Sequence, residues 1–131
     1  MAAHLEDVVL DNGLLYLGAN AGRVDLCETE PTNYTQATST NTKANATAGA
    51  GFTAPLFGSP AAKSGGGRQV SAAAISNAAV TGTTSTGVVW AAYSKITATT
   101  ALLAVLAITS QQLTSGNTWS QAASVIGIPA S

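Results

Sequence analysis

The scarcity of large apolar side chains is the feature that most constrains the fold of this chain. Only 27 of its 131 residues are Leu, Ile, Val or Phe, about a fifth of the sequence, which is close to the level at which chains stop folding. The formal net charge is only −1, whereas disordered chains usually combine low hydrophobicity with high net charge. We therefore predict a single folded domain over residues 1–131 with a thin core, to which neighbouring subunits would add apolar contacts.

The low charge density favours association. Charged residues make up 8% of the chain, so little electrostatic repulsion keeps copies apart. Such a surface suits a protein that packs against copies of itself or against a partner. The chain starts with acidic rather than basic residues, and its longest apolar run, residues 101–108, is too short to span a bilayer. We therefore expect no signal peptide and no membrane partner.

Acidic and basic residues are segregated along the chain. All six acidic residues lie within residues 6–30 beside a single arginine, a local charge of −5, whereas the remainder carries four cations and no acid. The two segments either neutralise each other within one subunit or dock between subunits, and the sequence leaves both open. As candidate subunit-contact residues we select four charged side chains and one aromatic side chain: Glu28, Glu30, Lys43, Arg68 and Tyr34.

Residues 4–19 are predicted to form a helix, with acidic residues in its first turn and Gly22 as a plausible stop. The sequence Asp-Asn-Gly at 11–13 is also a good hairpin turn between two apolar runs, so a hairpin is the alternative. Residues 23–27 then alternate well enough for a strand. The apolar residues of the predicted helix approximate one face at i, i+3 and i+4 spacing: Leu5, Val8, Val9, Leu15 and Tyr16.

Residues 29–51 consist of Thr, Asn, Ala and Ser with almost no large side chain, which predicts a long Thr/Ala-rich loop or extended arm. The segment supplies too little apolar area to offset its ordering entropy, about 1–2 kcal/mol per residue for the backbone. We therefore expect it to order against a neighbouring subunit, with Tyr34 as the anchor. The competing interpretation is an ordinary loop folded against its own domain.

The second half of the chain is predicted to be β-rich. Short runs rich in Val, Ile, Thr and aromatic residues are separated by turn signals about every ten residues, which is typical of an antiparallel sandwich or partly open barrel. Residues 88–94 are apolar on both faces, so this strand should be central. Pro129 should end the last strand. The predicted strands are residues 68–75, 79–84, 88–94, 101–109 and 118–126.

Groups that could support catalysis are few. His4 is the only histidine, so the many serines and threonines have no second histidine as a base, and we predict no catalytic residue. Cys27 is the only cysteine and is expected to be a buried structural thiol. The spacing of potential ligands predicts no metal site, no cofactor is implied, and four scattered cations indicate no nucleic-acid partner.

A set of turn and core motifs is distributed along the chain: Leu-Glu-Asp at 5–7, Leu-Leu-Tyr at 14–16, residues 23–27 and 30–34, Gly-Arg-Gln-Val at 67–70, Trp-Ala at 90–91, Leu-Leu at 102–103, Thr-Ser-Gly-Asn-Thr at 114–118 and Ile-Gly-Ile-Pro at 126–129. With these motifs the chain resembles small structural proteins encoded by tailed bacteriophages. The resemblance covers most of the chain except the Thr/Ala-rich segment.

The resemblance implies a virion component and carries over no active-site residue. We therefore expect a non-catalytic subunit that binds and stabilises an assembled capsid as a decoration or cement protein. Its partners would be the major capsid protein, copies of itself, or both. The alternatives are a tail, head–tail or receptor-contacting protein of a phage, and a bacterial surface adhesion module.

Overall fold

The structure is a computed structural model that describes residues 6–128, so His4, Leu5 and Pro129 lie outside the described residues. It is mainly β with one N-terminal α-helix, as the sequence predicts. The hairpin alternative for the N-terminal segment is wrong. In chain order the elements are α1 (Asp7–Asn20), β1 (Arg23–Cys27), the π-helix η1 (Gln36–Thr40), β2 (Thr42–Ala48), β3 (Gly51–Phe52), β4 (Ala61–Ala62), β5 (Arg68–Ala72), β6 (Ile75–Val80), β7 (Val88–Lys95), β8 (Ala101–Gln111), β9 (Thr118–Gln121) and β10 (Ser124–Ile128).

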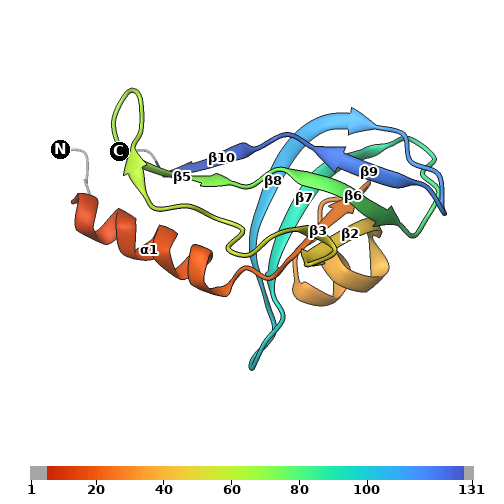
Figure 1. The fold of residues 1–131 in the computed structure, drawn as a ribbon, viewed down its shortest axis with the longest axis horizontal. Coiled ribbons are helices and arrows are strands. Elements are labelled where there is room, and N and C mark those ends of the chain that lie inside the picture. Colours follow the sequence, from red (N-terminus) through yellow and green to blue (C-terminus); the bar gives the residue numbers. More distant parts are fainter. Residues whose placement is uncertain (1–5, 129–131) are drawn as a thin grey trace.

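The strands form a curled sheet and a smaller one. The larger sheet has the order β8-β7-β1-β2-β6-β9, with β3 paired to β2, and every neighbouring pair along this order is antiparallel. The smaller sheet has the order β10-β5-β4. Figure 1 shows the larger sheet curling into a half-barrel, with α1 lying beside β5 and apart from β6 and β9. This architecture agrees with the predicted partly open barrel.

The chain passes from one sheet to the other at a corner made by two adjacent strand pairs. β5 pairs with β10 in the small sheet, and β6 pairs with β9 in the large one. The predicted strands 68–75 and 118–126 are therefore each broken in two, because a strand that changes sheet must bend. The break between the predicted strands 68–75 and 79–84 instead lies within β6, where Asn77 has a φ of 53° and the register shifts. The predicted strand 79–84 ends at Val80.

The core is built on one face of the large sheet. β1 is central, and Val24 and Leu26 belong to one buried cluster together with residues of β5, β6 and β7. β7 lies between β8 and β1, which confirms the predicted central position of residues 88–94. The rings of Phe57 and Tyr93 contact with centroids 5.3 Å apart. Much of the remaining core is alanine, so the large apolar side chains are few, as the composition requires.

The segment 29–51 is not an extended arm, and this prediction is corrected. β2 occupies an interior position of the large sheet between β1 and β6, and Ala44 and Ala46 are fully buried. The part before β2 covers the face of the sheet opposite the core: Ala37 of η1 is fully buried, and its carbonyl oxygen lies 3.7 Å from Cys27 Sγ. Backbone pairing and close packing of small side chains therefore hold this segment in place, rather than a large side chain such as the predicted anchor Tyr34.

Candidate functional site

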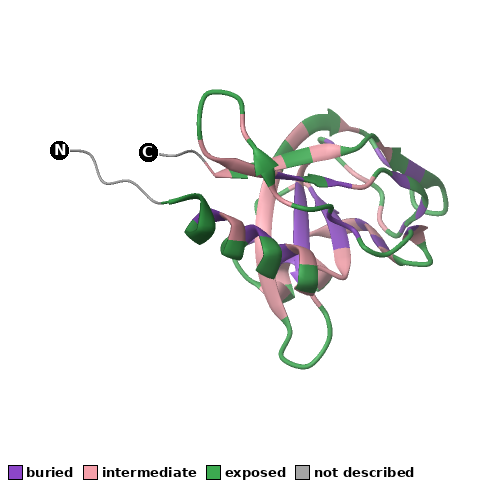
Figure 2. Ribbon diagram, turned by 60° about the vertical axis from the view of Figure 1, so that its left-hand side comes forward, coloured by how far each residue is buried: buried purple, intermediate pink, exposed green. Residues whose placement is uncertain are grey.

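The outer face of α1 is the most prominent unpartnered surface of the described chain. Leu10, Leu14 and Leu17 point inward and are buried. Of the apolar residues that the sequence places on one helical face, Val8, Val9, Leu15 and Tyr16 lie within the described chain, and they point to solvent. In Figure 2 the outward side of α1 is largely exposed, while its inward side is buried. We call Val8, Val9, Leu15 and Tyr16 together the α1 face. Their exposed fractions are 65%, 52%, 52% and 56%, in that order.

Charged groups on the inner flank fix α1 against the small sheet. Arg68 of β5 donates from Nε to Asp11 Oδ1 at 2.7 Å and from Nη2 to Asp11 Oδ2 at 3.2 Å. Its Nη1 also lies 4.0 Å from an Asp7 carboxylate oxygen. The hydrogen bond from Arg68 to Asp11 is the main cause that raises the pKa of Arg68 above its ordinary value. Both acids are thus directed toward Arg68, and the α1 face carries no charge.

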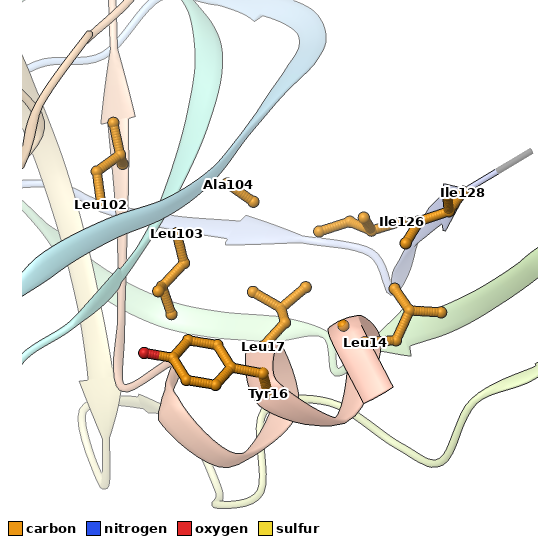
Figure 3. Close-up of a pocket in the computed structure, with 9 residues that line it drawn as sticks. Leu14, Tyr16, Leu17, Leu102, Leu103, Ala104, Ile126 and Ile128 are labelled. Atoms are coloured by element: carbon orange, nitrogen blue, oxygen red, sulfur yellow. The ribbon is translucent and has the colours of Figure 1, made fainter. Parts of the chain in front are cut away.

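An apolar groove lies beside the α1 face. It has a volume of about 330 Å³, and Figure 3 shows its walls formed by α1, β8 and β10. Tyr16 lines the groove and is also part of the α1 face, so the two form one continuous surface. The groove is lined by Gly13, Leu14, Tyr16 and Leu17 of α1, Leu102, Leu103 and Ala104 of β8, and Ile126 and Ile128 of β10.

A β-bulge explains how two consecutive leucines of β8 reach the groove. Successive residues of a regular strand point to opposite faces. Tyr93 pairs with Ala104 and Ser94 pairs with Leu102, so Leu103 is the extra residue of β8 at a register shift. A bulge of this kind re-aims side chains and bends the strand. Leu102 and Leu103 therefore both line the groove.

Two strands beside the groove each have one edge that pairs with no other strand of the described chain. In the part of the chain that the structure describes, β8 pairs with β7 alone and β10 pairs with β5 alone. β8 spans 11 residues, most of them half-buried. Long apolar edge strands are surfaces on which other chains pair, so this region is suited to protein contacts.

The predicted contact residues Glu28 and Lys43 meet within the subunit. The Glu28 carboxylate lies 3.8 Å from Lys43 Nζ and accepts hydrogen bonds from the backbone N–H groups of Ser85 and Thr86 and from the Thr86 hydroxyl. The Thr86 N–H is the largest of the causes that lower the pKa of Glu28, to which its hydroxyl, the Ser85 N–H and Lys43 add. Glu28 therefore clamps the loop between β6 and β7.

Arg68 likewise binds acidic residues of its own chain, as described above. The two charge segments thus make ion pairs within one subunit, at Glu28 with Lys43 and at Asp11 with Arg68. Glu30 is exposed, and Tyr34 is half-buried beside η1, where its carbonyl oxygen accepts a hydrogen bond from the Thr38 hydroxyl. Contacts of these residues with other subunits stay a prediction.

A buried polar cluster lies on the face of β1 opposite the core. Arg23 donates to both oxygens of Asp25 at 2.7 and 2.8 Å, and the Thr42 hydroxyl donates to Asp25 at 2.7 Å. Burial raises the pKa of the Asp25 carboxyl, and the bonds from Arg23 and Thr42 oppose that shift. Cys27 is fully buried, and burial, with a smaller effect of Asp25, raises its pKa to about 12. This cluster joins β1, β2 and η1.

Within residues 6–128 no group of three or more His, Cys, Asp or Glu side chains is placed to hold a metal ion. Nor does this described part contain a helix that is long and apolar enough to cross a membrane. Comparisons with models of protein families, with curated proteins and with solved structures found no match.

Sequence reasoning missed the groove, because its walls come from three segments distant in the chain. The α1 face was visible as a pattern, but the pattern did not show which side of the helix meets the core. One signal was present: α1 is apolar around most of its circumference, and such a helix is normally covered on all sides.

Proposed function

We propose that this chain is a non-catalytic structural subunit of a tailed-bacteriophage virion, which binds an assembled capsid as a decoration or cement protein. The observation that carries the proposal is the continuous apolar surface of the α1 face and the adjoining groove. Contiguous exposed apolar surfaces of this kind mark sites of protein contact. The resemblance of the sequence to phage structural proteins supplies the kind of assembly.

The proposed mechanism is mass action. A subunit that binds the assembled shell and not its loose components stabilises the shell by its own binding free energy, repeated at every site. No chemical step is needed. The thin core suits this role, because a subunit bound in an assembly gains apolar contacts that its own side chains do not provide.

The test is the copy number and position of the protein in purified virions, measured by quantitative mass spectrometry and by imaging of the particles. Hundreds of copies on the capsid surface are expected. A few copies, or a few dozen, at the tail would reject the decoration role in favour of a tail or head–tail role. Absence from the particles would reject a virion role altogether.

A further inference from the structure

The exposed apolar residues of α1 are arranged symmetrically about one residue. Val9 and Leu15 lie three positions before and after Asn12, and Val8 and Tyr16 lie four positions before and after it. Residues three and four apart share one helical face, which places Asn12 at the centre of the α1 face. When two copies of such a helix pack antiparallel about a twofold axis at Asn12, each Val8 faces the other copy's Tyr16. Each Val9 then faces the other copy's Leu15.

Charge permits this self-contact. Like charges brought together in an interface repel, but the α1 face carries none. Of the acids within α1, Asp11 pairs with Arg68 of β5 on the inner flank, and Asp7 lies 4.0 Å from the same guanidinium group. At the centre, Asn12 uses one N–H in a 2.7 Å bond to the Val8 carbonyl oxygen. An amide also has a second N–H and an accepting oxygen, which suit it to pair with its counterpart in the second copy.

The available area is sufficient for a reversible dimer. With half or more of each side chain exposed, the four residues of the α1 face offer about 400 Å² of apolar surface per copy. Two copies, with part of the groove beside Tyr16, then bury about 1,000 Å², the lower limit for a specific interface. A contact of this size agrees with a weak, concentration-dependent dimer rather than a permanent one.

From this symmetry, charge and area, we infer that the α1 face is a dimer interface. It binds the α1 face of a second copy in an antiparallel, twofold arrangement centred on Asn12. This inference makes specific the contact between copies that the sequence predicts. The dimer covers the α1 face, so the proposed contact with the shell falls to the rest of the groove and to the edges of β8 and β10. The inference concerns the isolated protein, so its main tests need no virions.

The first test is analytical ultracentrifugation of the purified full chain and of the variants Val9→Glu and Leu15→Lys. Both positions are about half exposed. An acid near a helix N-terminus and a cation nearer its C-terminus are compatible with the helix dipole, so α1 should stay folded. Each single variant buries an unpaired charge against an apolar side chain of the second copy. The dissociation constant of the dimer should therefore rise by about tenfold or more.

The matched control is Val125→Glu, which introduces the same charge at a residue with similar exposure, 46%, on β10. Val125 alternates with the groove-lining Ile126, so its side chain faces away from the groove. This variant should dimerise like the unmodified protein. A circular dichroism spectrum of every variant checks that the fold is retained.

The decisive test is the double variant Val9→Glu/Leu15→Lys. In the twofold arrangement each introduced carboxylate faces the introduced ammonium group of the other copy, so dimerisation should recover most of what either single variant loses. A monomeric unmodified protein, or a double variant as weak as the sum of its singles, would overturn the inference. If the unmodified protein is monomeric and Val9→Glu instead abolishes binding to virions, the α1 face serves the shell and the inference is wrong. A dimer that is absent from virions would leave the inference standing and reject the proposed function.

Discussion

Glu28 shows how one carboxylate can hold a loop in place. Its four partners belong to β2 and to the loop between β6 and β7, more than a dozen positions away in the chain. Hydrogen bonds to ionised groups are about twice as strong as those between neutral groups. Because these bonds favour the ionised carboxylate, they lower its pKa in the folded state and make the clamp dependent on pH.

We expect Glu28→Gln to reduce the acid sensitivity of folding. A carboxyl whose folded pKa is lowered adds stability above its unfolded pKa, ordinarily 4.5, and that stability is lost as pH falls through the folded pKa. The difference in unfolding free energy between the unmodified protein and the variant should therefore shrink between neutral pH and about pH 3. Urea denaturation at each pH measures it. A difference that is constant with pH would contradict the clamp.

A control for this prediction is Glu30→Gln, which removes an exposed carboxylate two positions away. Amide hydrogen exchange at Ser85 and Thr86 separates the two variants. Exchange at both amides should accelerate in Glu28→Gln, because their acceptor loses its charge, and should stay unchanged in Glu30→Gln.

Cys27 should react slowly with thiol reagents in the native protein. Its side chain is fully buried and its pKa is raised to about 12, chiefly by burial, so only a trace of the reactive thiolate exists at neutral pH. The rate of labelling in buffer should be far below the rate in denaturant, and the two are compared by absorbance. Equal rates would show that the cover formed by η1 opens readily.

At the scale of the element, α1 contains a glycine that its surroundings do not require. A Cβ added at Gly13 would lie 3.9 Å from Ile128 Cδ1, an ordinary contact. Glycine inside a helix costs about 0.5–1 kcal/mol relative to alanine. Gly13→Ala should therefore raise the free energy of unfolding by about that amount, as measured by chemical denaturation. A destabilised variant would contradict this placement of α1 against β10.

The matched substitution is Gly51→Ala in β3. Gly51 has a φ of 126°, and an added Cβ would lie 2.6 Å from Ala46 Cβ in β2. Backbone strain and overpacking of this kind cost about 1–3 kcal/mol each. We therefore expect the same change of side chain to destabilise the protein here.

At the scale of the whole molecule, stability should depend on protein concentration. Binding to the folded state raises the melting temperature by mass action, and the thin core leaves a larger share of the stability to such contacts. Differential scanning calorimetry over a range of concentrations should show the midpoint rising with concentration. In Val9→Glu the dependence should be weaker or absent. A high midpoint that does not change with concentration would count against both the thin-core interpretation and the dimer.

Local chemistry was sufficient to predict several elements. The acids at the start of α1, the strand at Arg23–Cys27 and the apolar faces of β7 are signals carried by neighbouring residues, and the structure agrees with them. β2 was missed although Thr42–Ala48 alternates small and polar residues with period two. This alternation is a weak signal because its buried positions are alanines. The burial of an alanine depends on the close approach of other strands, which the local sequence does not show.

The sequence alone determined the β-rich class, the single N-terminal helix and the small number of large core residues, because these depend on composition and on spacing within short segments. Tertiary structure decided which face of α1 is covered, since Leu10, Leu14 and Leu17 and the opposite α1 face are both apolar. It also decided that the acidic and basic segments pair within the subunit and that three separate segments form one groove. Such features depend on contacts between residues distant in the chain, which no local pattern encodes.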